Sequence, residues 1–154
     1  MNEGKVVGWY SGHIEFGSRA LGNRSILANP TFPDMKDKIN KVIKKREGFR
    51  PFAPMVIKEK QHMYFHMTDD IPYMNQVVKV KDEYVDKLPA VTHVDNSARV
   101  QTVYRNTPIH DLLTEFEKFS GYPILLNTSF KLIPPIDGRL RIKPFPVTYI
   151  VYKG

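Results

Sequence analysis

The residues that could do chemistry in this chain are cations set among glycines and small polar residues. They are Arg19 and Arg24 in Phe16–Ser25, Lys44, Lys45, Arg46 and Arg50 in Lys44–Pro54, and Arg99 in Asn96–Gln101. A guanidinium group pairs its N–H donors with the oxygen atoms of a phosphate or carboxylate. Several such groups converging on one place would hold a triphosphate or an acyl phosphate. The alternative reading is that each cation is a solvated surface charge.

A polar tripeptide, Asn127-Thr128-Ser129, follows the apolar segment Tyr122–Leu126, which has the composition of a buried strand. Open α/β sheets bind ligands at the carboxyl ends of their strands, so Asn127 and Ser129 are candidates for a binding site. An ordinary turn or a helix cap would explain the same pattern.

The histidines give a weaker signal. His62 and His66 are four residues apart, a spacing that occurs in metal sites when both face one side of a helix. No acidic third ligand lies beside them, so we predict no metal site. His93 could contact a ligand or be a hydrogen-bonded core histidine.

Several common catalytic signatures are absent from the sequence. It contains no P-loop and no G-x-G-x-x-G dinucleotide motif. The G-x-S-x-G elbow of hydrolases is also missing. Because the chain has no cysteine, disulfides, thiolate metal sites and cysteine nucleophiles are excluded. Any nucleotide site must therefore be of a less common kind.

Strand and helix patterns interleave along the chain and must position these groups. Strands are expected at Lys5–Tyr10, Arg24–Ala28, Phe52–Lys58, Tyr73–Lys81, Val91–Val94, Arg99–Tyr104, Tyr122–Leu126 and Val147–Tyr152. Helices are expected at Asp34–Lys45, Glu59–His66 and Ile109–Ser120, and in the first of them Met35, Ile39, Val42 and Ile43 should share one buried face. The order predicts an α/β or α+β fold with a mixed, twisted sheet.

The composition suits one folded domain of 154 residues, of which 42% are hydrophobic. With 23 basic and 16 acidic residues the net charge is +7, which favours an anionic partner, although solubility alone would also explain it. No apolar run approaches the roughly 18 residues that a membrane helix needs, and the start shows no signal-peptide pattern. We therefore expect no membrane partner and a cytoplasmic location.

Four of these segments occur together, in the same order and spacing, in one known family. They are E-F-G-S-R-A-L-G-N-R-S-I-L from Glu15, K-K-R-E-G-F-R-P-F-A-P from Lys44, A-V-T-H-V-D-N-S-A-R-V-Q-T-V from Ala90 and P-I-L-L-N-T-S-F from Pro123. The chain closely resembles, over Gly4–Phe130, the C-terminal domain of the NodU/CmcH O-carbamoyltransferases.

This resemblance implies a YrdC-like fold, in which helices pack on a twisted, open mixed sheet with a basic concave face. It implies that carbamoyl phosphate and ATP, the latter with Mg²⁺, react there to form carbamoyladenylate. The carbamoyl group then passes to a hydroxyl of a small acceptor. That second step belongs to an N-terminal domain, which holds Fe²⁺ through histidines. The chain would then be a half-enzyme that needs a separate N-terminal-type domain or subunit.

The matching motifs also imply roles for individual residues. Arg19, Lys44, Arg50 and Arg99 would be catalytic and clamp the phosphates and the carbamoyl group, Asn127 and Ser129 would complete the pocket, and Arg24 and Arg46 would be further substrate-binding residues. His93 is a candidate for substrate binding on its own pattern. The cations would offset the repulsion between the two anionic substrates and stabilise the charge that develops during the reaction.

The chain departs from the family pattern after Phe130. The family continues with Asn, a Gly-Glu-Pro stretch and a helix, whereas this chain reads Lys131-Leu132-Ile133-Pro134-Pro135. We expect residues 1–130 to form the domain and residues 131–154 to be its divergent tail. The alternative function is a YrdC-like RNA- or nucleotide-binding module without catalysis of its own, because a basic face with aromatic residues also suits nucleic acid.

Overall fold

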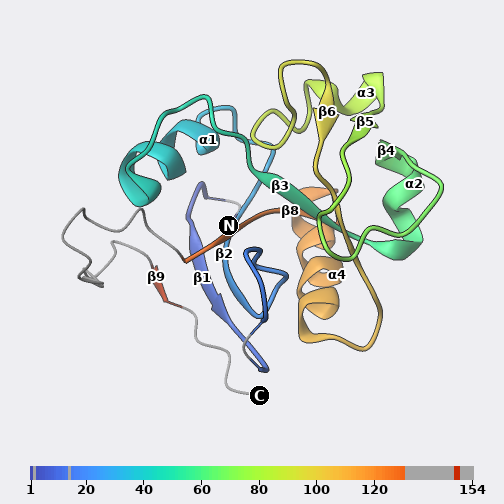
Figure 1. Cartoon of the computed structure of the whole chain (residues 1–154), viewed down its shortest axis with the longest axis horizontal. Helices are drawn as coiled ribbons and strands as arrows, with labels where there is room; N and C mark the ends of the chain where they lie inside the picture. The colour runs from blue at the N-terminus through green and yellow to red at the C-terminus, as the bar shows by residue number, and fades with distance from the viewer. Residues whose placement is uncertain (2, 14, 131–147, 150–154) are drawn as a thin grey trace.

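The computed structural model describes residues 1, 3–13, 15–130 and 148–149 (Figure 1). Within these residues six strands form a mixed sheet in the order β7-β3-β8-β2-β1-β9. The strands are β1 (Val7–Tyr10), β2 (Arg24–Ala28), β3 (Ala53–Ile57), β7 (Gln101–Val103), β8 (Ile124–Ser129) and β9 (Thr148–Tyr149). β8 lies between β2 and β3 and is antiparallel to both, whereas β3 pairs with β7 in parallel. β1 pairs antiparallel with β2 and in parallel with β9.

The predicted fold class is confirmed, since the chain folds as a mixed α+β structure around this sheet. The strand predicted at Arg24–Ala28 forms with those bounds, and those at Lys5–Tyr10 and Phe52–Lys58 form in slightly shorter versions. Of the last predicted strand, only Thr148 and Tyr149 are among the described residues. The rest of the predicted tail, residues 131–147 and 150–154, lies outside them.

A smaller sheet packs beside the main one, in the order β4-β5-β6 among the described residues. It contains β4 (Phe65–His66), β5 (Val78–Val80) and β6 (Ser97–Ala98), and it is accompanied by the short helices η2 (Lys58–Lys60), α2 (Gln61–Tyr64) and α3 (Asp82–Val85). The predicted strand at Tyr73–Lys81 is reduced to the three residues of β5, and Met74, with a left-handed φ of 53°, is not part of an extended strand.

The strand predicted at Val91–Val94 is wrong. The backbone N–H groups of Val91 and Thr92 both donate to the carbonyl of Leu88, so the chain turns there instead of extending. His93 then bonds through its own N–H to the carbonyl of Ser97, which closes the next turn. The β-branched residues that indicated a strand here include Val91, which fills the core instead.

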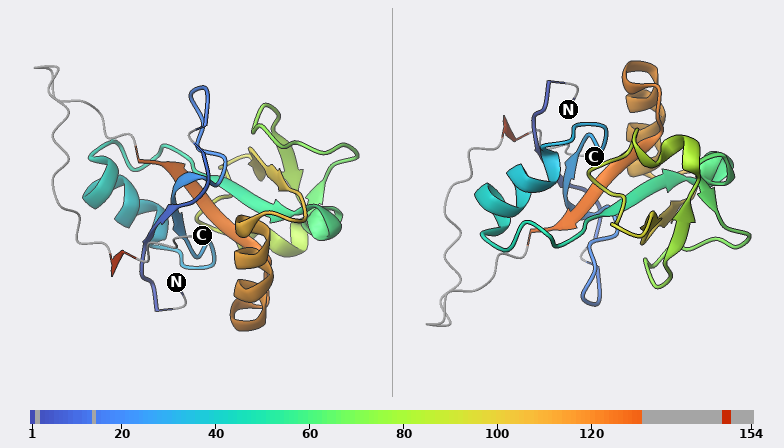
Figure 2. Two further views of the ribbon diagram at one scale, coloured as in Figure 1. Left: turned by 90° about the horizontal axis from the view of Figure 1, so that it is seen from below. Right: turned by 90° about the horizontal axis from the view of Figure 1, so that it is seen from above.

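The helix predicted at Ile109–Ser120 is confirmed as α4 (Pro108–Ser120). The Thr107 side chain accepts a hydrogen bond from the N–H of His110 and so caps its first turn. Gly121 ends the helix in the left-handed conformation, with φ of 79°. In both views of Figure 2, α4 stands apart from α1 and η1.

The helix predicted at Asp34–Lys45 exists, but it changes from an α-helix to a π-helix in the middle. Its first part is α1 (Met35–Lys38) and its second is the π-helix η1 (Ile39–Lys44). The expectation that Val42 shares the buried face is wrong, since that side chain is 55% exposed. The wider i→i+5 turns of a π-helix rotate Val42 outward and bring Lys44 inward.

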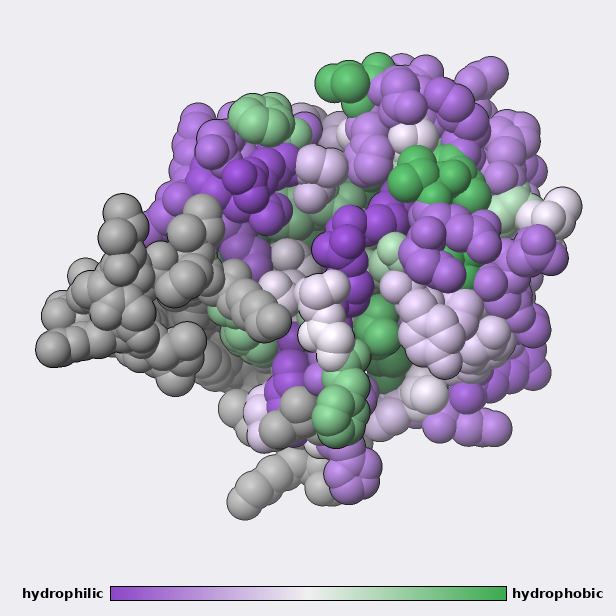
Figure 3. Space-filling view, viewed as in Figure 1, coloured by the Kyte–Doolittle hydropathy of each residue, from purple (hydrophilic) through white to green (hydrophobic). Residues whose placement is uncertain are grey.

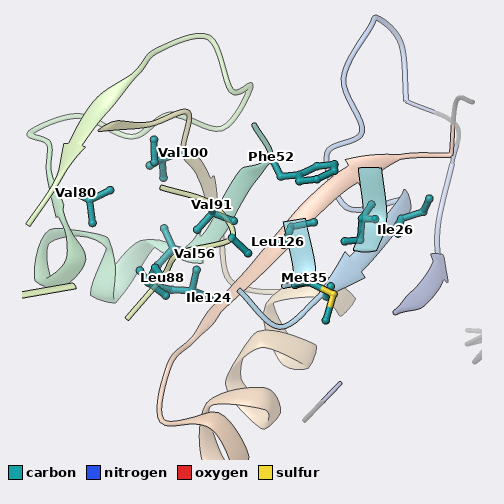
Figure 4. Packing of buried hydrophobic residues seen from close by; sticks show 14 of the residues in the cluster. Ile26, Met35, Phe52, Val56, Val80, Leu88, Val91, Val100, Ile124 and Leu126 are labelled. Carbon is teal, nitrogen blue, oxygen red and sulfur yellow. The ribbon is translucent and has the colours of Figure 1, made fainter. Parts of the chain in front are cut away.

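Both faces of the main sheet are covered by apolar side chains. Alternate residues of β2, β3 and β8 enter two clusters: Ile26, Val56, Ile124 and Leu126 in one, Leu27, Met55 and Leu125 in the other. Figure 4 shows the first cluster gathered along these strands. The surface in Figure 3 is mostly hydrophilic, with hydrophobic residues in separate patches. Among the helices that the structure describes, none combines the length and apolar composition needed to cross a bilayer.

Candidate anion-binding site

A cavity of about 230 Å³ opens at the carboxyl end of β8. Its lining includes four cations, Arg19, Lys44, Arg46 and Arg99, together with Asn127 and Ser129. These cations come from the loop before β2, from the end of η1 and the loop that follows it, and from the connection between β6 and β7. No carboxylate is present among the lining residues that the structure describes. The fold therefore gathers positive charge from distant segments into one site for an anion.

Lys44 forms the floor of this site and is only 3% exposed. Its Nζ donates to the backbone carbonyl of Ser129, the last residue of β8, and lies 3.4 Å from the Oγ of the same residue. Burial lowers the pKa of Lys44 to about 8, and the charge of Arg46 acts in the same direction. An anion in the cavity would favour the charged form of this lysine.

Asn40, a fully buried residue of η1, holds Arg46 in place. Its Oδ1 accepts a hydrogen bond of 2.7 Å from the Nε of Arg46. Its Nδ2 donates to the carbonyls of Gly48 and Arg50, at 3.2 and 3.0 Å. Lys45, with φ of 48°, reverses the chain between the helix and this loop. The guanidinium of Arg46 also lies 4.9 Å from the centre of the Phe52 ring, which fixes its direction.

Arg99 is half-buried and has no acidic partner among the described residues. Its Nε is buried, and no described residue offers an acceptor for its hydrogen bond. Burial lowers the pKa of Arg99, and the charges of Arg19 and Arg46 lower it further. The three guanidinium groups are therefore close enough to repel one another, and a bound anion would relieve that repulsion.

The loop that carries Arg19 is anchored to the sheet by two buried amides. Asn127 of β8 donates from Nδ2 to the carbonyl of Ala20, and Gln101 of β7 donates from Nε2 to the carbonyl of Leu21, at 2.8 and 2.7 Å. On the outer side, Oε1 of Glu15 accepts from the N–H groups of Leu21 and Asn23, both at 2.7 Å. Arg19 is exposed at the rim of the cavity, next to these fixed carbonyls.

Known proteins of similar sequence identify the family of this chain. Residues 1–136 match the family described as "Carbamoyltransferase C-terminus". The chain belongs to this carbamoyltransferase family. It is 51% identical over 133 residues to nodulation protein NolNO of Sinorhizobium fredii, which covers 83% of this chain and 20% of that protein.

Other relatives show the same relationship. Nodulation protein NolO of Bradyrhizobium diazoefficiens is 50% identical over 135 residues, and the match covers 84% of this chain and 25% of NolO. Nodulation protein U of Rhizobium fredii is 46% identical over 127 residues, and the match covers 81% of this chain and 22% of that protein. The chain therefore spans a fifth to a quarter of the length of these relatives. The resemblance seen in the sequence motifs is confirmed.

In this carbamoyltransferase domain, six of the nine predicted site residues line the cavity. They are Arg19, Lys44, Arg46, Arg99, Asn127 and Ser129. Arg50 does not line it and pairs its Nε with Glu47 at 2.8 Å. Arg24 also lies outside: its guanidinium stacks 3.2 Å from the centre of the Tyr10 ring and donates to the carbonyls of Ser11 and Gly12.

His93 is the third predicted residue that the lining does not include. Its Nδ1 lies 3.1 Å from the Oγ of Ser97, within its own turn. Burial lowers the pKa of His93; the nearby charge of Arg99 acts in the same direction and Asp95 opposes it. This histidine is thus near the cationic cluster but engaged elsewhere, and its role in binding stays a prediction.

Sequence reasoning missed three residues that shape the site. Asn40 and Gln101 position its loops, and Met74 lines the cavity with a left-handed backbone. Asn40 and Gln101 share a signal that could have revealed them, because each is a polar residue inside an apolar pattern. Met74 has no such signal, since its position depends on long-range folding.

The domain offers few metal ligands. Among the described residues, no group of three or more His, Cys, Asp or Glu side chains is arranged to hold a metal ion. The Nδ1 of His62 lies 2.8 Å from the carbonyl of Met67, which occupies one of its two ring nitrogens. The described residues that line the cavity include no carboxylate, so they do not fit a magnesium ion held by protein carboxylates.

Proposed function

We propose that this domain binds carbamoyl phosphate and ATP at the cationic cavity and converts them to carbamoyladenylate for O-carbamoyl transfer. Family membership supports a carbamoyl-transfer role. The observation that carries the finer proposal is the gathering of Arg19, Lys44, Arg46 and Arg99 around one cavity, with no carboxylate among its described lining residues. Such a lining is suited to two phosphorylated substrates that would otherwise repel each other.

The proposed reaction has two steps, and each step breaks one bond and forms another. Water releases inorganic phosphate from carbamoyl phosphate and leaves carbamate. A carbamate oxygen then attacks the α-phosphorus of ATP, the bond to the bridging oxygen of the β-phosphate breaks, and pyrophosphate leaves. The cations hold both reactants in line and stabilise the charge on the phosphoryl oxygens in the transition state.

The size of the cavity supports a division between the two substrates. Its volume of about 230 Å³ is below the roughly 300–1,000 Å³ of sites that enclose a drug-sized ligand. Carbamoyl phosphate is small enough to enter fully. The nucleotide would then extend past the exposed Arg19 at the rim, with its α-phosphate next to the carbamoyl group.

We propose that the transfer to an acceptor hydroxyl is completed by an N-terminal-type domain or subunit that carries Fe²⁺. The chain spans only a fifth to a quarter of the length of its nodulation-protein relatives, which supports a second unit for this step. The present domain would supply the activated carbamoyl group.

The test measures pyrophosphate released by the full chain from ATP and carbamoyl phosphate. We expect release only when both substrates are present, and a sharp loss in Arg99→Ala. If calorimetry detects binding of neither substrate to folded protein, the proposal is wrong. Tight RNA binding that ATP does not displace would favour the nucleic-acid alternative instead.

A further inference from the structure

One polar atom of the Asn127 side chain has no hydrogen-bond partner among the residues that the structure describes. The residue is 2% exposed and lies in the cavity wall. Its Nδ2 donates to the carbonyl of Ala20 and to the Oε1 of Gln101, both at 2.8 Å. Its Oδ1 is buried and no atom of the described residues donates to it.

The orientation of this amide is fixed by its neighbours. Gln101 uses its own Nε2 to donate to the carbonyl of Leu21, so its Oε1 is the atom that faces Asn127. An Asn127 side chain turned by 180° would set its oxygen against two acceptors. Oδ1 is therefore the atom left over, and it can only accept a hydrogen bond.

Buried polar atoms in proteins nearly always have a hydrogen-bond partner, so an exception beside a cavity calls for a partner from outside these residues, which is a bound water or a ligand. The cations of the lining are donors, and they suit phosphate oxygens of any acyl phosphate. Oδ1 has the opposite requirement, because it needs a donor. The –NH₂ of a carbamoyl group is such a donor, whereas the –CH₃ of an acetyl group is not.

We propose that Asn127 Oδ1 accepts a hydrogen bond from the carbamoyl –NH₂ and selects carbamoyl phosphate over acyl phosphates that lack an N–H. This inference rests on the proposed function. Arg99, another residue of the lining, has a buried Nε that finds no acceptor among the described residues, and this atom is a donor. A carbamoyl group carries both an acceptor oxygen and an N–H donor, so it matches both unpaired atoms.

The test uses two stable phosphonates that differ only in this group. Phosphonoacetamide carries –CO–NH₂ and 2-oxopropylphosphonate carries –CO–CH₃ on the same phosphonate. We expect calorimetry on the full chain to show about tenfold or tighter binding of the amide, because the ketone leaves the acceptor unpaired. In Asn127→Ala the two compounds should bind equally.

Gln101→Ala provides the matched control. It removes the other amide that anchors the loop and one of the two acceptors of Asn127 Nδ2, while the carbonyl of Ala20 remains to hold the Asn127 amide in its orientation. We expect both compounds to bind more weakly while the amide keeps its advantage. If Gln101→Ala also loses that advantage, Asn127 acts only through the loop and the inference is wrong.

The unaltered chain decides the question even where a variant fails to fold. Equal binding of the two phosphonates would overturn the role of Asn127 but leave the anion site intact. Binding of neither phosphonate would instead count against the proposed function.

Discussion

The Nζ of Lys44 donates to the backbone carbonyl of Ser129, and this bond joins the end of η1 to the end of β8. The two residues are 85 positions apart in sequence. Their contact closes the inner side of the cavity and puts an ammonium group where an anion would lie. Because the site surrounds that group with further cations, its charge state should control binding.

Sulfate binding should weaken as the pH rises through about 8. Burial lowers the pKa of Lys44 to about 8, so the side chain is charged below that pH and neutral above it. Sulfate keeps its charge over this range, so a change in affinity reports on the protein. We expect calorimetry to show an inflection near pH 8 in the unaltered chain. Lys44→Met should bind sulfate more weakly, and an inflection that persists in this variant would exclude Lys44 as its cause.

The same pKa shift predicts how stability depends on pH. The pKa of Lys44 falls from an ordinary 10.5 to about 8, so between these values the unfolded chain binds more protons than the folded one. The contribution of this residue to the free energy of unfolding should therefore rise with pH across that window. Urea unfolding at pH 7.5 and pH 10 measures the rise. A rise equally large in Lys44→Met would contradict the assignment.

Arg99→Ala should weaken binding of ATP by at least about tenfold, whereas Arg50→Ala should have a smaller effect. Arg99 lines the cavity and its buried Nε has no partner among the described residues, whereas Arg50 pairs with Glu47 outside the lining. Calorimetry on the two variants compares one charge removed from inside the cavity with one removed from outside. An equal loss in both would show that Arg50 turns toward the substrates, as the family resemblance implies.

The main elements could be predicted because their signals are local. Thr107 caps α4 and Gly121 ends it, and both positions are visible in the sequence. The consecutive apolar residues of β2 and β8 also mark these segments locally as strands buried on both faces. These patterns need no knowledge of distant segments.

The direction of individual cations could not be predicted in the same way. Arg24 and Arg19 lie in one glycine-containing segment, yet Arg24 turns away to stack on Tyr10 from another strand. Lys44 points inward only because the helix widens into a π-helix, which shifts every later side chain. Such outcomes depend on long-range packing, so the motifs pointed to most of the residues that line the cavity but not to the direction of each side chain.

Asn40→Ala should lower the free energy of unfolding by about 2–4 kcal/mol, since it removes three hydrogen bonds and leaves buried groups unpaired. It should also weaken ATP binding, because Arg46 loses the partner that positions it. Urea unfolding measures the first effect and calorimetry the second. Lys41→Ala is the control: its exposed pair with Asp37 spans 3.5 Å and should change stability by less than about 0.5 kcal/mol. Equal effects of the two variants would show that Asn40 has no special structural role.

Gly22→Ala should destabilise the domain by about 1–2 kcal/mol more than Gly17→Ala. The two glycines have almost the same backbone, with φ of 105° and 106°, so alanine is strained to a similar degree at both. They differ in surroundings: a Cβ at Gly22 would lie 3.2 Å from Ile109 of α4, whereas nothing lies within 4 Å of one at Gly17. The difference between the two unfolding free energies therefore isolates the close approach of the Arg19 loop to α4. If Gly17→Ala is as damaging as Gly22→Ala, backbone strain alone accounts for both, and the packing of Gly22 against Ile109 does not hold the loop.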